Sequence, residues 1–142
     1  MPQPTGNHDH ALEGAATILI VEDEMLVRGP IAEFLRDRGY HVLEAGDARE
    51  AIELVDDGRE HVDVVFSDVR MAGEMDGFGL ARWIRRHHPE VSVLLASGYF
   101  YSADGARDYP SDVPVIPKPY SQLQVERRIE HLLRSRISQH VA

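Results

Sequence analysis

The sequence predicts an α/β fold in which a five-stranded parallel sheet is covered by helices on both faces. Five short apolar runs alternate with stretches of helical periodicity, and strict alternation of this kind is typical of right-handed β-α-β crossovers. The run Val62–Phe66 is nearly continuous in valine and phenylalanine, as expected for a strand buried on both faces of a sheet. A length of 142 residues suits one domain of ordinary size.

The expected strands and helices follow one another in a regular order. Strands are expected over five apolar runs: Thr17–Val21, His41–Ala45, Val62–Phe66, Val91–Leu95 and Val113–Ile116. Five helices are expected after them: over Leu26–Leu35, over Asp47–Asp56, from Phe78 to the residue before Pro89, weakly within Tyr99–Pro110, and from Ser121 onward.

Capping residues mark several of the predicted helix ends. Gly39 ends the first helix, and Asp47 caps the second. Ser121 and Gln124 have the spacing of a capping box at the start of the last helix. Pro30 has no N–H donor, so the first helix either starts late, with Pro30 in its first turn, or bends at this residue.

Composition divides the chain into one domain and two short tails. Residues 1–16 carry prolines and glycines and few apolar side chains, so a flexible N-terminal tail is expected. Residues 17–136 are expected to form the folded domain, and residues 137–142 a C-terminal tail. The cluster His8-Asp9-His10 lies in the flexible tail and makes a poor metal site.

Several classes of protein are excluded by composition. The chain has no cysteine, which excludes disulfides and thiolate metal sites. No apolar run is long enough to span a membrane and no secretory signal pattern is present, so a cytoplasmic protein is expected. The formal net charge of −9 argues against a nucleic-acid partner and suits a protein that gathers carboxylates around a cation.

Polar side chains follow four of the predicted strands at their C-terminal ends. They are Glu22 and Asp23 after the first strand, Asp68 after the third, Ser97 after the fourth and Lys118 after the fifth. Open α/β sheets bind their ligands at the edge where these strand ends meet. Glu44, near the end of the second strand, is expected to face solvent as an edge charge.

The residue types at this edge favour a site for a cation and a phosphoryl group. Carboxylates about 4 Å apart repel by roughly 4 kcal/mol per pair at an effective dielectric of about 20, and a divalent cation removes this repulsion. Hard oxygen ligands favour Mg²⁺. With the hydroxyl of Ser97 and the ammonium of Lys118, Mg²⁺ beside Asp68 would cradle a phosphoryl group, which carboxylates can accept. Each residue taken alone also has an ordinary structural role, as a strand end, helix cap, turn or solvated charge.

Four motifs make the chain similar to the receiver domains of two-component response regulators. In chain order they are Ile18–Glu24 (ILIVEDE), Phe66–Met71 (FSDVRM), Leu94–Tyr99 (LLASGY) and Pro117–Tyr120 (PKPY). The resemblance covers Ala16–Arg134, and the order and spacing of the motifs also match. It implies a flavodoxin-like, doubly wound sheet with the strand order 2-1-3-4-5.

The resemblance implies a role for each polar residue at the predicted edge. Asp68 would be the phosphoacceptor, charged from a phosphohistidine of a histidine kinase or a histidine phosphotransfer protein. Ser97 would donate a hydrogen bond to the phosphoryl group, and Lys118 would contact it. Mg²⁺ would be held by four groups: Glu22, Asp23, Asp68 and the backbone carbonyl of Arg70.

The resemblance also implies a signalling domain and not an enzyme, since it would catalyse only its own phosphorylation and dephosphorylation. A stand-alone receiver would switch protein–protein interactions through the loop and helix after the fourth strand, the fifth strand and the last helix. Its downstream target is not identified by the sequence, and a second copy of this chain is a further candidate partner.

Three positions depart from the common receiver pattern. The acidic pair is Glu-Asp where two aspartates are commoner, and Val115 stands where an aromatic switch residue is frequent. The cluster Tyr99-Phe100-Tyr101 is a candidate substitute for that switch. Arg70 and Tyr99 sit two residues past Asp68 and Ser97, where their bulk would limit attack by water, so a long-lived phosphoryl group is expected.

Three other functions compete with this one. Phosphatases with an aspartyl nucleophile generally carry Asp-x-Asp, and Arg70 occupies the second carboxylate position here. Nucleotide binding needs a glycine-rich first turn, whereas Glu22-Asp23-Glu24 is acidic. A receiver-like interaction module that works without phosphorylation remains the main alternative.

Overall fold

The computed structural model describes residues 15–98 and 113–141, with the side chains of residues 136–141 left out of the description. The weak helix expected within 99–110, the Tyr99-Phe100-Tyr101 cluster and the His8-Asp9-His10 cluster lie outside the described residues. The described helices therefore number four, and the expected fifth falls in the part that is not described.

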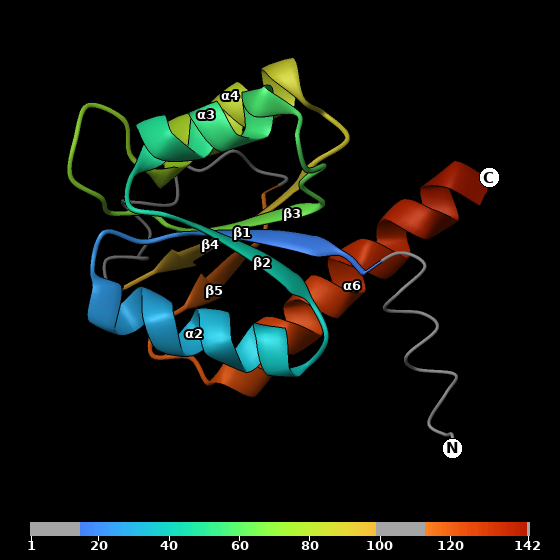
Figure 1. The fold of residues 1–142 in the computed structure, drawn as a ribbon, viewed down its shortest axis with the longest axis horizontal. Helices are drawn as coiled ribbons and strands as arrows, with labels where there is room; N and C mark the ends of the chain where they lie inside the picture. Colours follow the sequence, from blue (N-terminus) through green and yellow to red (C-terminus); the bar gives the residue numbers. More distant parts are fainter. Residues whose placement is uncertain (1–14, 99–112, 142) are drawn as a thin grey trace.

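The described residues form a five-stranded parallel sheet with helices on both faces. The strands are β1 (Thr17–Val21), β2 (His41–Ala45), β3 (Val64–Asp68), β4 (Ser92–Ser97) and β5 (Val115–Pro117). The helices are α2 (Met25–Asp37), α3 (Ala48–Asp57), α4 (Gly77–His87) and α6 (Gln122–Val141). The strand order is β2-β1-β3-β4-β5, which confirms the predicted flavodoxin-like fold. α2 and α6 cover one face of the sheet, and α3 and α4 cover the other (Figure 1).

Three strands have bounds that differ from those expected. β3 was expected at Val62–Phe66 but runs from Val64 to Asp68, where Ser67 and Asp68 pair with Leu95 and Ala96 of β4. Polarity does not end this strand, because the ladder is built from backbone groups: β1 pairs with it as far as Ser67, and β4 as far as Asp68. β4 begins one residue later than expected, at Ser92, and β5 is shifted to Val115–Pro117.

Two apolar layers fill the spaces between the sheet and the helices. On the side of α2 and α6, the largest buried contributors include Ile18, Ile20, Leu35, Phe66, Leu94 and Ile129. On the side of α3 and α4 they include Leu19, Val21, Val65, Leu80 and Ile84. β1 supplies both layers because alternate side chains of a strand point to opposite faces. A central strand packed in this way gives the carboxyl edge a rigid support.

The caps predicted from the sequence are present in α3 and α6, whereas the starts of α4 and α2 differ from the prediction. The Asp47 carboxylate accepts a hydrogen bond from the Glu50 N–H, and Ser121 and Gln124 form the reciprocal bonds of a capping box. α4 begins one residue earlier than expected, with Asp76 as its cap.

In α2 the expectation of a late start is wrong, because the helix begins at Met25 and contains Pro30 in its interior. Pro30 cannot donate to the carbonyl of Leu26. The side chain of Leu26 is 90% exposed, so water can reach this part of the helix. Gly39 follows the end of α2 with a positive φ of 100°, as its predicted role as a stop requires.

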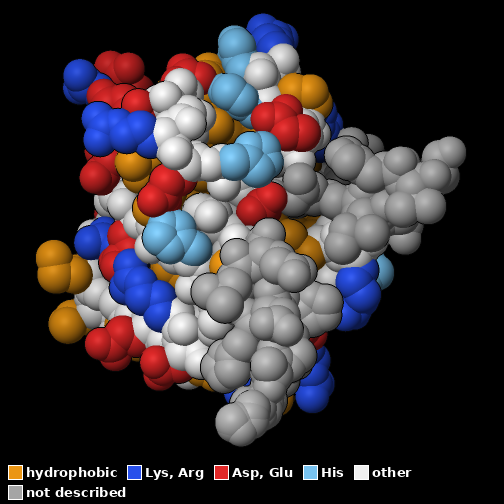
Figure 2. Space-filling model, turned by 45° about the vertical axis from the view of Figure 1, so that its right-hand side comes forward, with side chains coloured by type: hydrophobic (Ala, Val, Ile, Leu, Met, Phe, Trp, Pro, Cys, Tyr) orange, Lys and Arg blue, Asp and Glu red, His pale blue; other side chains and the backbone are white. Residues whose placement is uncertain are grey.

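Histidines lie among acidic side chains on one face of the molecule (Figure 2). His41 is 2.7 Å from a Glu60 carboxylate oxygen, and His88 is 2.8 Å from a carboxylate oxygen of Asp56. His88 is partly buried and joins the ends of α3 and α4. Among the helices of the described residues, none combines the length and apolar character needed to cross a bilayer.

Candidate functional site

Asp68 lies at the last position of β3 and faces Lys118, which directly follows β5. Its Oδ1 atom is 3.0 Å from Lys118 Nζ, and its side chain is 11% exposed. The backbone N–H of Lys118 donates to the carbonyl of Ser97 at 2.7 Å, which fixes the lysine beside the end of β4. The ion pair therefore sits on two strand ends that the sheet itself holds in place.

Ser97 is fully buried at the last position of β4. It pairs in register with Pro117 of β5, directly before Lys118, and the preceding Ala96 pairs with Asp68. The structure thus brings together Asp68, Ser97 and Lys118, as expected for strand ends that meet at one edge.

Glu22 is the most unusual titratable group at this edge. It directly follows β1 and is only 6% exposed, and its Oε2 atom accepts a hydrogen bond from the Glu24 N–H at 3.0 Å. Burial is the main cause that raises the pKa of Glu22 to about 7; the Glu24 bond opposes it, while the charge of Asp68 and the hydrogen bond with Asp23 add to it. The fold therefore holds a buried carboxyl close to those of Asp23 and Asp68.

Asp23 is exposed and connects the first turn to the loop after β3. Its Oδ2 atom accepts a hydrogen bond from the Ala72 N–H at 3.2 Å. Together with Arg70, Met71 and Asp76 it borders an open hollow beside the end of β3. The structure thus places Arg70 on the same rim as Asp23.

The donor set of this edge fits Mg²⁺. Among the described residues no three His, Asp or Glu side chains are spaced to hold a metal by themselves. Mg²⁺ does not need such a cage, since it takes one or two carboxylates and keeps several waters. The burial of the Glu22 carboxyl beside Asp23 and Asp68 is the observation that favours a cation here.

Two site neighbours were not found from the sequence. Tyr120 packs edge-on against Phe66, with ring centroids 5.7 Å apart. Burial foremost, and then the charges of Glu22 and Asp68, raise the pKa of Tyr120 to about 12. Gly77, at the start of α4, donates its N–H to the Val69 carbonyl at 2.8 Å. A β-carbon at Gly77 would collide with the backbone of Asp68 and Val69, so this close approach requires glycine.

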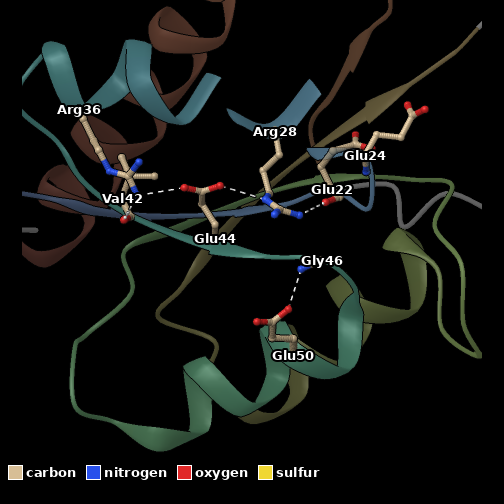
Figure 3. A network of polar contacts seen from close by, with 8 residues as sticks. All are labelled: Glu22, Glu24, Arg28, Arg36, Val42, Glu44, Gly46 and Glu50. Carbon is tan, nitrogen blue, oxygen red and sulfur yellow. Dashed lines mark hydrogen bonds and ion pairs between the residues drawn. The ribbon is translucent and has the colours of Figure 1, made fainter. Parts of the chain in front are cut away.

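Arg28 and Glu44 form a third feature that the sequence did not indicate. Glu44 was expected to face solvent, but it binds Arg28 at 3.0 Å and Arg36 at 3.2 Å. The same Arg28 donates to the backbone carbonyl of Glu22 at 2.7 Å (Figure 3). The expectation for Glu44 is therefore wrong, because α2 covers this part of β2 and presents two arginines to it. The only available signal was the eight-residue spacing of two arginines on one face of a helix.

The fold and the site define a flavodoxin-like α/β domain with an acidic site at the carboxyl edge of its sheet. The chain belongs to the response regulator receiver domain family, whose family model matches residues 18–130. It is a receiver domain of two-component signalling, as the sequence motifs predicted.

Relatives and solved structures agree with this membership. The sensor kinase CckA of Brucella abortus is 41% identical over 124 residues, which are 86% of this chain and 13% of that protein. The transcriptional regulatory protein PdtaR of Mycobacterium tuberculosis is 38% identical over 124 residues, which are 85% of this chain and 57% of that protein. The chain thus spans only part of the length of these curated relatives.

Two crystal structures show the same fold. A response regulator receiver protein from Sinorhizobium medicae superposes with a TM-score of 0.77 at 28% identity, covering 87% of this chain and 98% of the other. The receiver domain of the hybrid histidine kinase CckA superposes with a TM-score of 0.68 at 32% identity, covering 83% of this chain and 99% of the other.

Proposed function

We propose that this chain accepts a phosphoryl group on Asp68 from a phosphohistidine of a histidine kinase or histidine phosphotransfer protein. The observation that carries the proposal is the contact between Asp68 Oδ1 and Lys118 Nζ at 3.0 Å, beside buried Ser97. Receiver domains generally bind Mg²⁺ at this edge. Here Glu22, Asp23, Asp68 and the carbonyl of Arg70 would hold it.

The reaction transfers the phosphoryl group between two side chains. A carboxylate oxygen of Asp68 forms a bond to phosphorus as the bond from phosphorus to the donor histidine nitrogen breaks, and the histidine leaves with the electron pair. Lys118 is placed to move from the carboxylate to a phosphoryl oxygen, and Ser97 to donate its hydroxyl hydrogen. Mg²⁺, when bound, supplies charge neutralisation for the phosphoryl oxygens.

The output of the proposed switch is a change of protein–protein contacts. Ser97 and Lys118 belong to β4 and to the segment after β5, so a phosphoryl group that engages both would alter the loop after β4, β5 and the start of α6. A stand-alone receiver in the cytoplasm would act on a separate target or on a second copy of itself. Arg70 is exposed at the rim and Tyr99 lies outside the described residues, so the expected long life of the phosphoryl group stays a prediction.

The test is the intact mass of the protein after incubation with Mg²⁺ and acetyl phosphate. Wild type is expected to gain one phosphoryl group, while Asp68→Asn, which keeps the shape of the side chain, gains none. Asp57→Asn, which changes an exposed carboxylate at the end of α3, should gain the group like wild type. If wild type gains no mass and binds no Mg²⁺, the acidic edge is structural and the interaction-module alternative is correct.

A further inference from the structure

We propose that Arg28 and Glu44 are positioning residues that hold the turn of residues 22–24 in the shape needed to bind Mg²⁺. This inference rests on the proposed function in one respect, namely that carboxylates of this turn bind the cation. It assigns no chemistry to either residue. Both act through the backbone of the turn.

Arg28 binds the turn and its support at the same time. Its Nη1 atom donates to the Glu22 carbonyl at 2.7 Å, and its Nε atom donates to Glu44 Oε1 at 3.0 Å. The side chain is only 15% exposed, so water competes weakly for these bonds. A guanidinium suits this task because its donors are fixed in one plane, whereas a lysine ammonium is a single point charge.

These bonds tie both backbone groups of Glu22 to β2. The Glu22 N–H donates to the Ala45 carbonyl at 3.0 Å, and the Glu22 carbonyl reaches Glu44 of the same strand through Arg28. Figure 3 shows Arg28 descending from α2 between the turn and β2. By contrast, the carboxylate of Asp23 has a longer bond, 3.2 Å, to the Ala72 N–H. We infer that the position of the acidic pair depends on the anchor at Glu22.

Glu44 is itself held from two sides. Its second oxygen accepts a bond from Arg36 at 3.2 Å, and Arg36 also donates to the Val42 carbonyl at 3.0 Å. Arg28 and Arg36 lie two helical turns apart on the face of α2 that covers β2. Glu44 therefore fixes the orientation of Arg28, while the bonds that the Arg36 side chain makes within the described residues go to Val42 and Glu44 of β2.

Charge and geometry predict opposite results when Arg28 is changed. If Arg28 acted only through its positive charge, its removal would strengthen binding of a cation at the acidic edge. If it positions the turn, its removal weakens binding, because the ligands are no longer held in place. The sign of the change therefore separates the two explanations.

The experiment is a titration of the metal-free full chain with Mg²⁺ by isothermal titration calorimetry. Arg28→Met and Arg28→Lys are each expected to raise the Mg²⁺ dissociation constant about tenfold, at the low end of the usual effect of residues that orient metal ligands. Arg28→Lys keeps the positive charge, so a loss of Mg²⁺ affinity in this variant reports the change in geometry alone. Glu44→Gln is also expected to raise the Mg²⁺ dissociation constant.

Arg36→Met is the matched control, since it removes one arginine from the same helix and the same carboxylate. Its Mg²⁺ affinity should stay within about twofold of wild type. Equal losses in Arg36→Met and Arg28→Met would overturn the proposal, as would unchanged or tighter binding by Arg28→Met.

Amide hydrogen exchange of the metal-free protein gives a second readout. In Arg28→Met the Glu22 and Glu24 amides are expected to exchange faster than in wild type, while the core amides of β1 keep their protection. Unchanged exchange at these two amides would contradict the positioning role. If wild type binds no Mg²⁺ but the amides of the variant do exchange faster, the anchor exists and the proposed metal site is what fails.

Discussion

Glu22 is an acidic side chain held in the protein interior, and its ionisation works against folding. Its pKa is raised from 4.5 to about 7, chiefly by burial, so the folded state keeps the proton that the unfolded state loses. The stabilising effect of the bound proton is complete below pH 4.5 and is lost as the pH rises to about 7.

We expect Glu22→Gln to increase the free energy of unfolding at pH 8 by on the order of 2 kcal/mol in Mg²⁺-free buffer. The gain should shrink toward pH 4.5, where wild type is neutral at this position as well. Urea denaturation across this pH range measures the effect, and Glu33→Gln on the exposed side of α2 is the control. A gain that is the same at every pH would contradict the assignment to ionisation.

Gly77 and Gly29 offer a matched pair of glycine substitutions. Gly77→Ala is expected to lower the free energy of unfolding by about 2 kcal/mol, because its β-carbon would meet the backbone at the end of β3. Gly29→Ala, inside α2 and directly before Pro30, should change it by less than about 1 kcal/mol, because the gain in helix propensity is offset by contact between the new β-carbon and the proline ring. Chemical denaturation measures the free energy of unfolding of both variants. Equal changes in the two would contradict the role given to the close approach at Gly77.

At the residue scale, the sequence located the groups whose position follows from being at a strand end. Asp68, Ser97 and Lys118 come together because parallel strands share one edge. Arg28 and Glu44 could not be paired in advance, since their contact depends on how α2 lies over β2. Gly77 could not be predicted for the same reason. A β-carbon is excluded there only because α4 packs closely against the backbone at the end of β3.

At the scale of single elements, type and order followed from the sequence while boundaries did not. The apolar run of β3 was recognised, but the strand continues through two polar residues because backbone pairing with β4 continues. The sequence predicted hydrogen bonds more reliably where donor and acceptor lie close together in the chain. The capping box of Ser121 and Gln124 needs only three residues of separation, and it is present.

The capping box makes a prediction about α6. Ser121→Ala is expected to lower the free energy of unfolding by about 1 kcal/mol, because the Gln124 N–H loses its acceptor. Ser135→Ala is the control, since that hydroxyl donates to the His131 carbonyl within the helix and caps nothing. Thermal unfolding of the two variants should therefore differ, and a larger loss at Ser135 would show that the box is not stabilising.

At the scale of the whole molecule, the sheet separates two apolar layers. Ile129 lies in the layer beneath α6 and Ile84 in the layer beneath α4, and both are fully buried. The alternation of strands and helices predicted this two-sided arrangement. The strand order came from the family resemblance, because alternation alone leaves several orders open.

We expect Ile129→Val and Ile84→Val each to lower the free energy of unfolding by about 1 kcal/mol. The double variant should lose the sum within about 0.5 kcal/mol, because the two sites lie on opposite faces and share no partner. Its urea transition should remain single and have the same slope as wild type. A coupling energy above about 1 kcal/mol would mean that the sheet transmits packing changes between its faces.

The position of β1 inside the sheet, between β2 and β3, has a consequence for synthesis of the protein. β1 is the first strand to be made, yet one of its neighbours, β3, begins more than forty residues later, at Val64. Its residues Ile18 and Ile20 share a core layer with Val125 and Ile129 of the last helix. On the ribosome the most apolar strand must therefore wait for the end of the domain before it is covered, so folding is completed only after nearly all of the domain has emerged.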